Sequence, residues 1–291
     1  MSENARGRAG ETAVAHRYHG MLGDPDADLR PRATLEQAIS RRRFLGIATT
    51  ALGLAAIGCP SADPVDDIPS AAPDRLLFRP RDPTRPSVPG LHPLGATNGR
   101  DGLFYVPRSL PPGRPAPLLV LLHGAGGSAA NWFGAWTAHA EATGMVIAAP
   151  DSRDATWQMG TRGGGRDARF VDQLLAAVTD TVSIDAGRVA LGGFSDGASY
   201  ALTLGLVNGD VFQRIVAFSP GFILPGTQTG RPRLFVSHGT QDTILPIDRC
   251  SRLIVPMLRR SGYEVEYVEF EGGHRVPSEI RERALAWLAE R

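Results

Sequence analysis

The sequence predicts a doubly wound, mostly parallel sheet with helices on both faces, a fold of the α/β class. Two observations favour this fold. Short apolar segments of the kind that lie buried in parallel sheets alternate with longer segments that show helical periodicity. A serine between two glycines, in the segment 193–197, stands where one such strand meets the helix that follows it. The content of 42% hydrophobic and 21% charged residues is ordinary for a globular protein with a sizeable core.

The expected strands and helices alternate along the C-terminal part of the chain. The strands are expected at residues 102–106, 118–122, 146–149, 189–191, 215–218, 234–236 and 265–270. The helices are expected at residues 129–143, 168–182, 198–207, 250–260 and 277–290. Most strands are followed by a helix that must pack back onto the sheet, which gives parallel neighbours. The connection 219–232 is rich in Gly and Pro and has no helical pattern, so no substantial lid domain is expected.

The N-terminal residues 1–59 carry a pattern typical of export. They begin with a polar, Arg-rich stretch that is expected to be largely disordered. The run Arg41–Arg43 directly precedes a short apolar segment that ends at Cys59, which is similar to a twin-arginine signal followed by a lipobox. The segment is too short for a membrane span of about 20 residues. A buried helix is the alternative to a signal, and cleavage nearby is the alternative to acylation of Cys59.

Residues 60–88 are rich in Pro, Asp and Arg, a composition that favours an extended linker over a packed core. The catalytic domain is therefore expected at residues 89–291.

Charge and residue usage exclude several classes of function. A formal net charge of +1 gives no reason to expect nucleic acid or an acidic membrane as a partner. All 31 basic residues are Arg, which excludes Schiff-base lysines, P-loops and Ser-Lys dyads. Two cysteines are too few for a disulfide framework or a zinc site, so Cys250 is expected to be a small buried apolar side chain. No metal and no organic cofactor are expected.

The segment 193–197 reads GFSDG and matches the pattern G-x-S-x-G. This pattern places a serine on a strained, exposed turn between a strand and a helix. Gly193 and Gly197 fit such a turn because the two backbones pass too close for a Cβ atom. The pentapeptide alone is weak evidence, but the strand before it and the helix after it make Ser195 the candidate nucleophile.

A second glycine-rich turn, His123–Gly127, follows the apolar strand at residues 118–122. Its glycines leave backbone N–H groups free next to the start of a helix, as an oxyanion hole requires. We expect the two donors to be the N–H groups of Ala125 and of Asp196, the residue after the nucleophile. The alternative is an ordinary Gly-rich turn.

The base and the acid are expected in loops after the last two strands. His274 follows two glycines at the end of strand 265–270 and is the candidate base. Asp242 follows strand 234–236 and is the candidate acid, with Asp248 on the same loop as the alternative and helix capping as a structural explanation. Three other histidines are expected to be structural: His123, His139 and His238.

On these residues the domain resembles the α/β-hydrolase superfamily. Within it, the chain is similar to small bacterial esterases that include polyhydroxybutyrate depolymerase-like, feruloyl-esterase-like and phospholipase/carboxylesterase-like enzymes. The segments that carry this resemblance are HGAGG at 123–127, RDARFV at 166–171, ID at 184–185 with RV at 188–189, GFSDG at 193–197, HG at 238–239 with Asp242, and His274.

The resemblance implies the α/β-hydrolase fold, the chain order Ser195, Asp242, His274 for a catalytic triad, and cleavage of short acyl, aryl or polyester-type esters through an acyl-enzyme. The chain departs from the group at Asp196, where Asn often follows the serine. Since only the backbone N–H is used, the chemistry should survive, with a changed pH dependence.

Three matters stay open at this stage. The same machinery would serve a serine peptidase, and a non-catalytic envelope protein that retains the fold is a further alternative. Trp157, on the loop 152–166 beside the expected site, could stack on a flat acyl group or pack against the edge of the sheet. The export pattern predicts the periplasm or cell envelope, with membrane attachment only through Cys59, and the oligomeric state is open.

Overall fold

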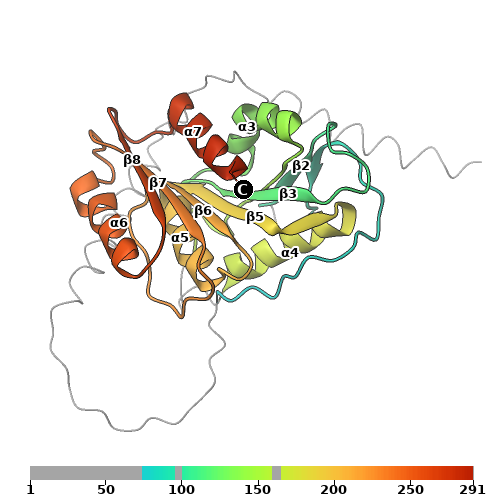
Figure 1. Cartoon of the computed structure of the whole chain (residues 1–291), viewed down its shortest axis with the longest axis horizontal. Coiled ribbons are helices and arrows are strands. Elements are labelled where there is room, and N and C mark those ends of the chain that lie inside the picture. The colour runs from blue at the N-terminus through green and yellow to red at the C-terminus, as the bar shows by residue number, and fades with distance from the viewer. Residues whose placement is uncertain (1–73, 96–99, 159–164, 291) are drawn as a thin grey trace, which may run out of the picture. The chain divides into compact units, whose positions relative to one another are not determined.

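The computed structural model describes residues 74–95, 100–158 and 165–290 (Figure 1). The predicted export signal and the lipobox at Cys59 lie outside these residues and stay predictions. Within the described ranges, the helices are each too short or too polar to cross a membrane.

Eight strands form one sheet in the order β1-β2-β4-β3-β5-β6-β7-β8. The strands are β1 (Gly90–Pro93), β2 (Gly102–Val106), β3 (Ala116–Leu122), β4 (Val146–Pro150), β5 (Ile184–Phe194), β6 (Arg214–Phe218), β7 (Arg233–Gly239) and β8 (Val265–Phe270). β1 pairs with β2 and β2 with β4 in antiparallel fashion, and the other neighbours are parallel. The predicted mostly parallel sheet is confirmed, and β1 is a strand that the sequence analysis missed.

Helices cover both faces of this sheet (Figure 1). They are α3 (Ala130–Thr143), α4 (Arg166–Thr181), α5 (Asp196–Val207), α6 (Ser251–Arg260) and α7 (Ser278–Ala289), with a short 3-10 helix, η2 (Ile247–Arg249). The buried side chains form two apolar clusters, one shared with α4, α5 and α6 and the other with α3 and α7. The doubly wound architecture therefore follows from strands that are apolar on both faces.

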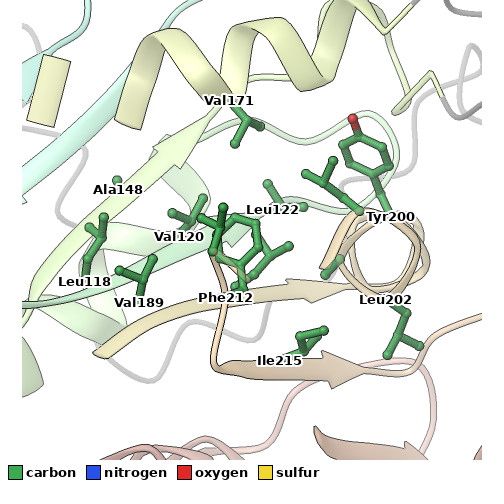
Figure 2. Packing of buried hydrophobic residues seen from close by; sticks show 14 of the residues in the cluster. Leu118, Val120, Leu122, Ala148, Val171, Val189, Tyr200, Leu202, Phe212 and Ile215 are labelled. Carbon is green, nitrogen blue, oxygen red and sulfur yellow. The ribbon is translucent and has the colours of Figure 1, made fainter. Parts of the chain in front are cut away.

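Alternation along β3 shows how one strand supplies both clusters. Leu118, Val120 and Leu122 belong to the cluster with α4 and α5, whereas Leu119 and Leu121 belong to the cluster with α3 and α7. Figure 2 shows the first cluster, with Val171 of α4 pointing toward the row of β3 side chains. Successive side chains of a strand point to opposite faces, so a continuous apolar segment is what a sheet covered on both sides requires.

The folded domain begins earlier than predicted. Leu76 and Phe78 are buried in the cluster with α4 and α5. The N–H of Leu76 donates to Asn208 Oδ1 at 2.8 Å, and the N–H of Phe78 donates to Asp172 Oδ1 at 2.9 Å. These contacts correct the predicted linker 60–88 at its C-terminal end. The Pro- and Arg-rich composition of this stretch gave no sign of packing. Its two apolar residues nevertheless bury their side chains, and their backbone N–H groups donate to side chains of the domain and not to a strand of the sheet.

Residues 219–232, between β6 and β7, contain no helix. The expectation that no substantial lid domain covers the sheet at this connection is confirmed.

Candidate active site

The predicted turn between β5 and α5 has the strained geometry that the glycine pattern indicates. Ser195 has φ 59° and ψ −119°, a conformation that costs a non-glycine residue about 1–3 kcal/mol. A Cβ atom on Gly193 would lie 2.3 Å from the Gly197 carbonyl oxygen, and one on Gly197 would lie 2.2 Å from the Leu122 carbonyl oxygen. Both glycines are therefore required for the close approach of β3, β5 and α5.

Three side chains from three loops form a continuous chain of hydrogen bonds. Ser195 Oγ lies 2.8 Å from His274 Nε2, and His274 Nδ1 lies 2.6 Å from Asp242 Oδ2. An ionised carboxylate can only accept, so Nδ1 carries the proton and Nε2 is left to accept the serine hydroxyl. The structure thus brings together the three residues predicted as nucleophile, base and acid.

Asp242 is held as a charged acceptor. Its side chain has no solvent exposure, and Oδ1 accepts the N–H groups of Ile244 at 2.9 Å and Leu245 at 2.8 Å. Burial alone would raise the pKa of Asp242, but hydrogen bonds from His238 and His274 outweigh it and hold that pKa below its ordinary value. The carboxylate therefore stays ionised beside the imidazole of His274.

Asp248, the alternative acid, lies elsewhere. Its side chain is 75% exposed and pairs with Arg252 at 2.7 Å on the surface of η2 and α6. The geometry distinguishes the two aspartates of this loop, and Asp242 is the one that contacts His274.

The two predicted oxyanion donors lie in different segments. Ala125 is in the glycine-rich turn after β3, and Asp196 is the first residue of α5. Within the described residues, the N–H groups of Ala125 and Asp196 have no hydrogen-bond acceptor, whereas Gly126 N–H is bound to the Ala155 carbonyl oxygen at 2.7 Å. A Cβ atom on Gly124 would lie 3.4 Å from Ser195 Cβ, so this turn lies close to Ser195. Two free N–H groups beside a serine can stabilise an oxyanion, and the N-terminus of α5 adds a favourable dipole.

His123 holds the glycine-rich turn in shape, which fits the structural role expected of it. Its Nδ1–H donates to the Gly124 carbonyl oxygen at 2.8 Å, and its Nε2 accepts the Ser152 N–H at 2.9 Å. Burial lowers the pKa of His123 to about 4, so the imidazole is neutral near pH 7. Arg100 supports the same turn through a 2.8 Å hydrogen bond to the Gly127 carbonyl oxygen.

The Asp196 carboxylate binds the loop after β4. It accepts hydrogen bonds from the Thr156 hydroxyl and, at 3.0 Å, from the Trp157 N–H. Burial raises the pKa of Asp196 to about 6, against the opposing effect of these two hydrogen bonds. One residue therefore offers a backbone N–H to the site and uses its side chain to position a neighbouring loop.

Trp157 is packed inside the domain. Its side chain is buried, its indole N–H donates to the His123 carbonyl oxygen at 2.7 Å, and its ring stacks on Tyr200 with centroids 5.2 Å apart. Of the two alternatives, the structure shows a packed Trp157, whose ring neighbour is Tyr200 of α5 and not the edge of the sheet. Its polar atom is satisfied and a face of the ring is covered, so the indole is part of the core.

Three supporting residues escaped the sequence analysis. Thr156 binds Asp196, Arg100 binds the turn at Gly127, and Asp167 accepts the N–H groups of Arg153 and Gln158 at 2.6 Å each. These three act through tertiary contacts, and no local spacing in the sequence signals them.

Cys250 is a free, buried cysteine, as expected, and burial raises the pKa of its thiol to about 11. Among the described residues no group of three His, Cys, Asp or Glu side chains could hold a metal ion.

Two family models match overlapping parts of the domain. The Phospholipase/Carboxylesterase model matches residues 166–290, and the Esterase model matches residues 97–227. Together they cover the glycine-rich turn at 123–127, the turn at 193–197 and the loops of Asp242 and His274.

Curated relatives match the same domain. Feruloyl esterase C of Emericella nidulans is 28% identical over 162 residues, which are 52% of this chain and 58% of the relative. A bifunctional acetylxylan esterase/xylanase of Neocallimastix patriciarum is 30% identical over 156 residues, which are 50% of this chain and 22% of the relative. The chain thus spans only part of the length of these relatives.

A solved structure shows the same fold. The crystal structure of esterase PE8 superposes with a TM-score of 0.55 and 23% identity over 65% of this chain and 97% of that chain. With this sheet, the strained turn at Ser195 and the two family matches, the chain has the α/β-hydrolase fold and is similar to serine esterases.

Proposed function

We propose that the domain hydrolyses carboxylic esters by two-step acyl transfer with Ser195 as nucleophile. The observation that carries this proposal is the hydrogen-bond chain from Ser195 Oγ through His274 to Asp242, with links of 2.8 Å and 2.6 Å. A serine is a weak nucleophile by itself, and an adjacent base oriented by a buried acid activates it.

In the first step His274 Nε2 accepts the Ser195 proton while Oγ attacks the ester carbonyl carbon. The resulting oxyanion accepts the N–H groups of Ala125 and Asp196, and the charge that develops on His274 is stabilised by Asp242. Collapse of the intermediate breaks the ester C–O bond, and His274 donates its proton to the departing alcohol. Water, deprotonated by His274, then cleaves the acyl-enzyme and restores Ser195.

For substrates we propose esters with short acyl, aryl or polyester-type groups. The names of the relatives, a feruloyl esterase and an acetylxylan esterase, support an aryl or small acyl group. The connection 219–232 lacks a helix that could close over a long alkyl chain. Burial of one CH₂ group would contribute about 0.8 kcal/mol to binding, and a CH₂ group that stays in water contributes nothing. Long chains therefore gain little affinity.

A panel of substrates tests the proposed class of reaction. The panel comprises feruloyl esters, acetylated sugars, p-nitrophenyl acetate and acyl-peptide anilides. Turnover of the esters with little cleavage of the anilides is expected. Preferential cleavage of the anilides would favour the alternative function, a serine peptidase with the same triad, and no turnover at all would favour a non-catalytic binding protein.

We further propose that the protein is exported to the periplasm or cell envelope and that Cys59 anchors it through a lipid. The support is the pattern of Arg41–Arg43, a short apolar segment and Cys59.

A further inference from the structure

A second histidine contacts the acid of the triad. His238, near the end of β7, and Asp242 both have side chains with no solvent exposure. His238 Nε2 lies 2.8 Å from the Leu245 carbonyl oxygen and 3.3 Å from Asp242 Oδ2. A carbonyl and an ionised carboxylate can only accept, so Nε2 carries a proton, which it donates to the Leu245 carbonyl oxygen while facing Asp242 Oδ2.

The other ring nitrogen of His238 has a partner that fits this tautomer. Nδ1 lies 2.6 Å from Ser251 Oγ at the start of α6. With the proton on Nε2, the neutral ring accepts the Ser251 hydroxyl at Nδ1. The imidazole therefore has a partner on both nitrogens and one orientation in the core.

Both histidines contact the same carboxylate oxygen. Asp242 Oδ2 lies 2.6 Å from His274 Nδ1 and 3.3 Å from His238 Nε2. We propose that His238 is a positioning residue for the reaction, which orients Asp242 and sets how much negative charge its Oδ2 presents to His274. This inference rests on the proposed esterase function.

The proposal predicts a direction for the pH dependence. The N–H of His238 withdraws charge from Oδ2, which weakens the stabilisation that Asp242 gives to protonated His274. Without that N–H, His274 keeps its proton to a higher pH. The acid limb of the pH profile of kcat/KM therefore moves to higher pH.

The other titratable groups around this pair do not obscure such a shift. The Cys250 thiol, next to Ser251, has a pKa raised to about 11, first by burial and then by the charge of Asp242. Glu269 of β8 faces His238, but Arg252 binds it at 2.6 Å, which lowers its pKa. Both groups keep their protonation state near neutral pH.

Two substitutions separate charge tuning from simple packing. His238→Met keeps similar bulk and removes the polar contacts of the ring with Leu245, Asp242 and Ser251. His238→Gln offers an amide N–H to Asp242 and a carbonyl to the Ser251 hydroxyl. The measurement is kcat/KM for p-nitrophenyl acetate from pH 4.5 to 9, together with the Tm of each variant.

We expect His238→Met to move the acid limb to higher pH by about half a unit, because the variant leaves more of the negative charge of Asp242 Oδ2 facing His274. His238→Gln should keep the acid limb of the pH profile where the wild type has it, and should keep most of the wild-type kcat. If both variants lose Tm and kcat while the limb stays in place, His238 only packs, and the proposal is wrong.

A third variant covers the case in which His238→Met does not fold. Ser251→Ala removes the hydroxyl that donates to His238 Nδ1 and should move the limb in the same direction by a smaller amount. An unmoved limb in Ser251→Ala together with unfolded His238→Met would overturn the proposal. Absence of ester hydrolysis by the wild-type protein would instead overturn the proposed function.

Discussion

The carboxylate of Asp196 accepts the backbone N–H of Trp157 at 3.0 Å and so ties the start of α5 to the loop after β4. Ala155, on that loop, accepts the N–H of Gly126 in the glycine-rich turn, and the Trp157 indole donates to the His123 carbonyl oxygen at the start of the same turn. The side chain next to the nucleophile thus supports both proposed oxyanion donors.

The buried charge of Asp196 should make stability fall as the pH rises. The folded-state pKa of about 6 lies above the ordinary value of 3.8, so Asp196 favours the folded state below about pH 4 and loses that contribution as the pH passes 6. Asp196→Asn does not titrate. Its stability relative to the wild type should therefore improve between pH 4 and pH 7 by on the order of 2 kcal/mol, measured by urea unfolding. A difference that stays constant with pH would show that the carboxyl group does not ionise in this range.

The two aspartates of the β7–α6 connection form a matched pair of variants. Asp242→Asn should lower kcat by on the order of 10⁴-fold, because the amide favours the wrong tautomer of His274. Asp248→Asn, on the exposed side of the same connection, should leave kcat nearly unchanged. Steady-state kinetics with p-nitrophenyl acetate measure both. The reverse pattern would mean that Asp248 is the acid.

Acyl-chain preference follows from the lack of a helix between β6 and β7. Esters of C2–C4 acids should be hydrolysed faster than esters of C12–C16 acids. A long chain would stay largely in water and would not gain the burial free energy of about 0.8 kcal/mol per CH₂. The rate should also show no jump above the critical micelle concentration of the substrate. Faster turnover of C12–C16 p-nitrophenyl esters would contradict this expectation.

Export should depend on the guanidinium groups of Arg41, Arg42 and Arg43. Replacing all three with Lys keeps the charge and removes the paired guanidinium groups, so the protein should accumulate inside the cell, as cell fractionation with activity assays would show. Normal export of this variant would count against a twin-arginine route. Cys59→Ala should separately release active protein from membranes, and its retention there would argue against a lipid anchor.

Local sequence patterns predicted the features that depend on backbone geometry. The apolar segments of β3 and β5 required burial on both faces, and Gly193 and Gly197 marked a turn that leaves no room for a Cβ atom. The positions of Asp242 and His274 followed from the strand ends, since the carboxyl ends of parallel strands meet at one edge of the sheet.

The features that the sequence did not reveal depend on contacts between distant segments. Leu76 and Phe78 lie in a Pro- and Arg-rich stretch whose composition resembles a linker, yet Asn208 and Asp172 supply the acceptors that dock it. Trp157 lies on a loop, where aromatic side chains often meet ligands, and only the positions of partners far along the chain determine that it is buried.

The central claim, that Ser195 is an activated nucleophile, is tested most directly by covalent labelling with a fluorophosphonate probe near pH 8. Only a serine whose proton is taken up by a neighbouring base reacts readily with such a reagent. The wild-type protein should be labelled stoichiometrically at Ser195, as mass spectrometry of its peptides would show. Ser195→Ala should take up no label and His274→Ala should react at least about 10³-fold more slowly, with folded Tm values in both variants. A folded wild-type protein that stays unlabelled, or that is labelled at another residue, would contradict the claim.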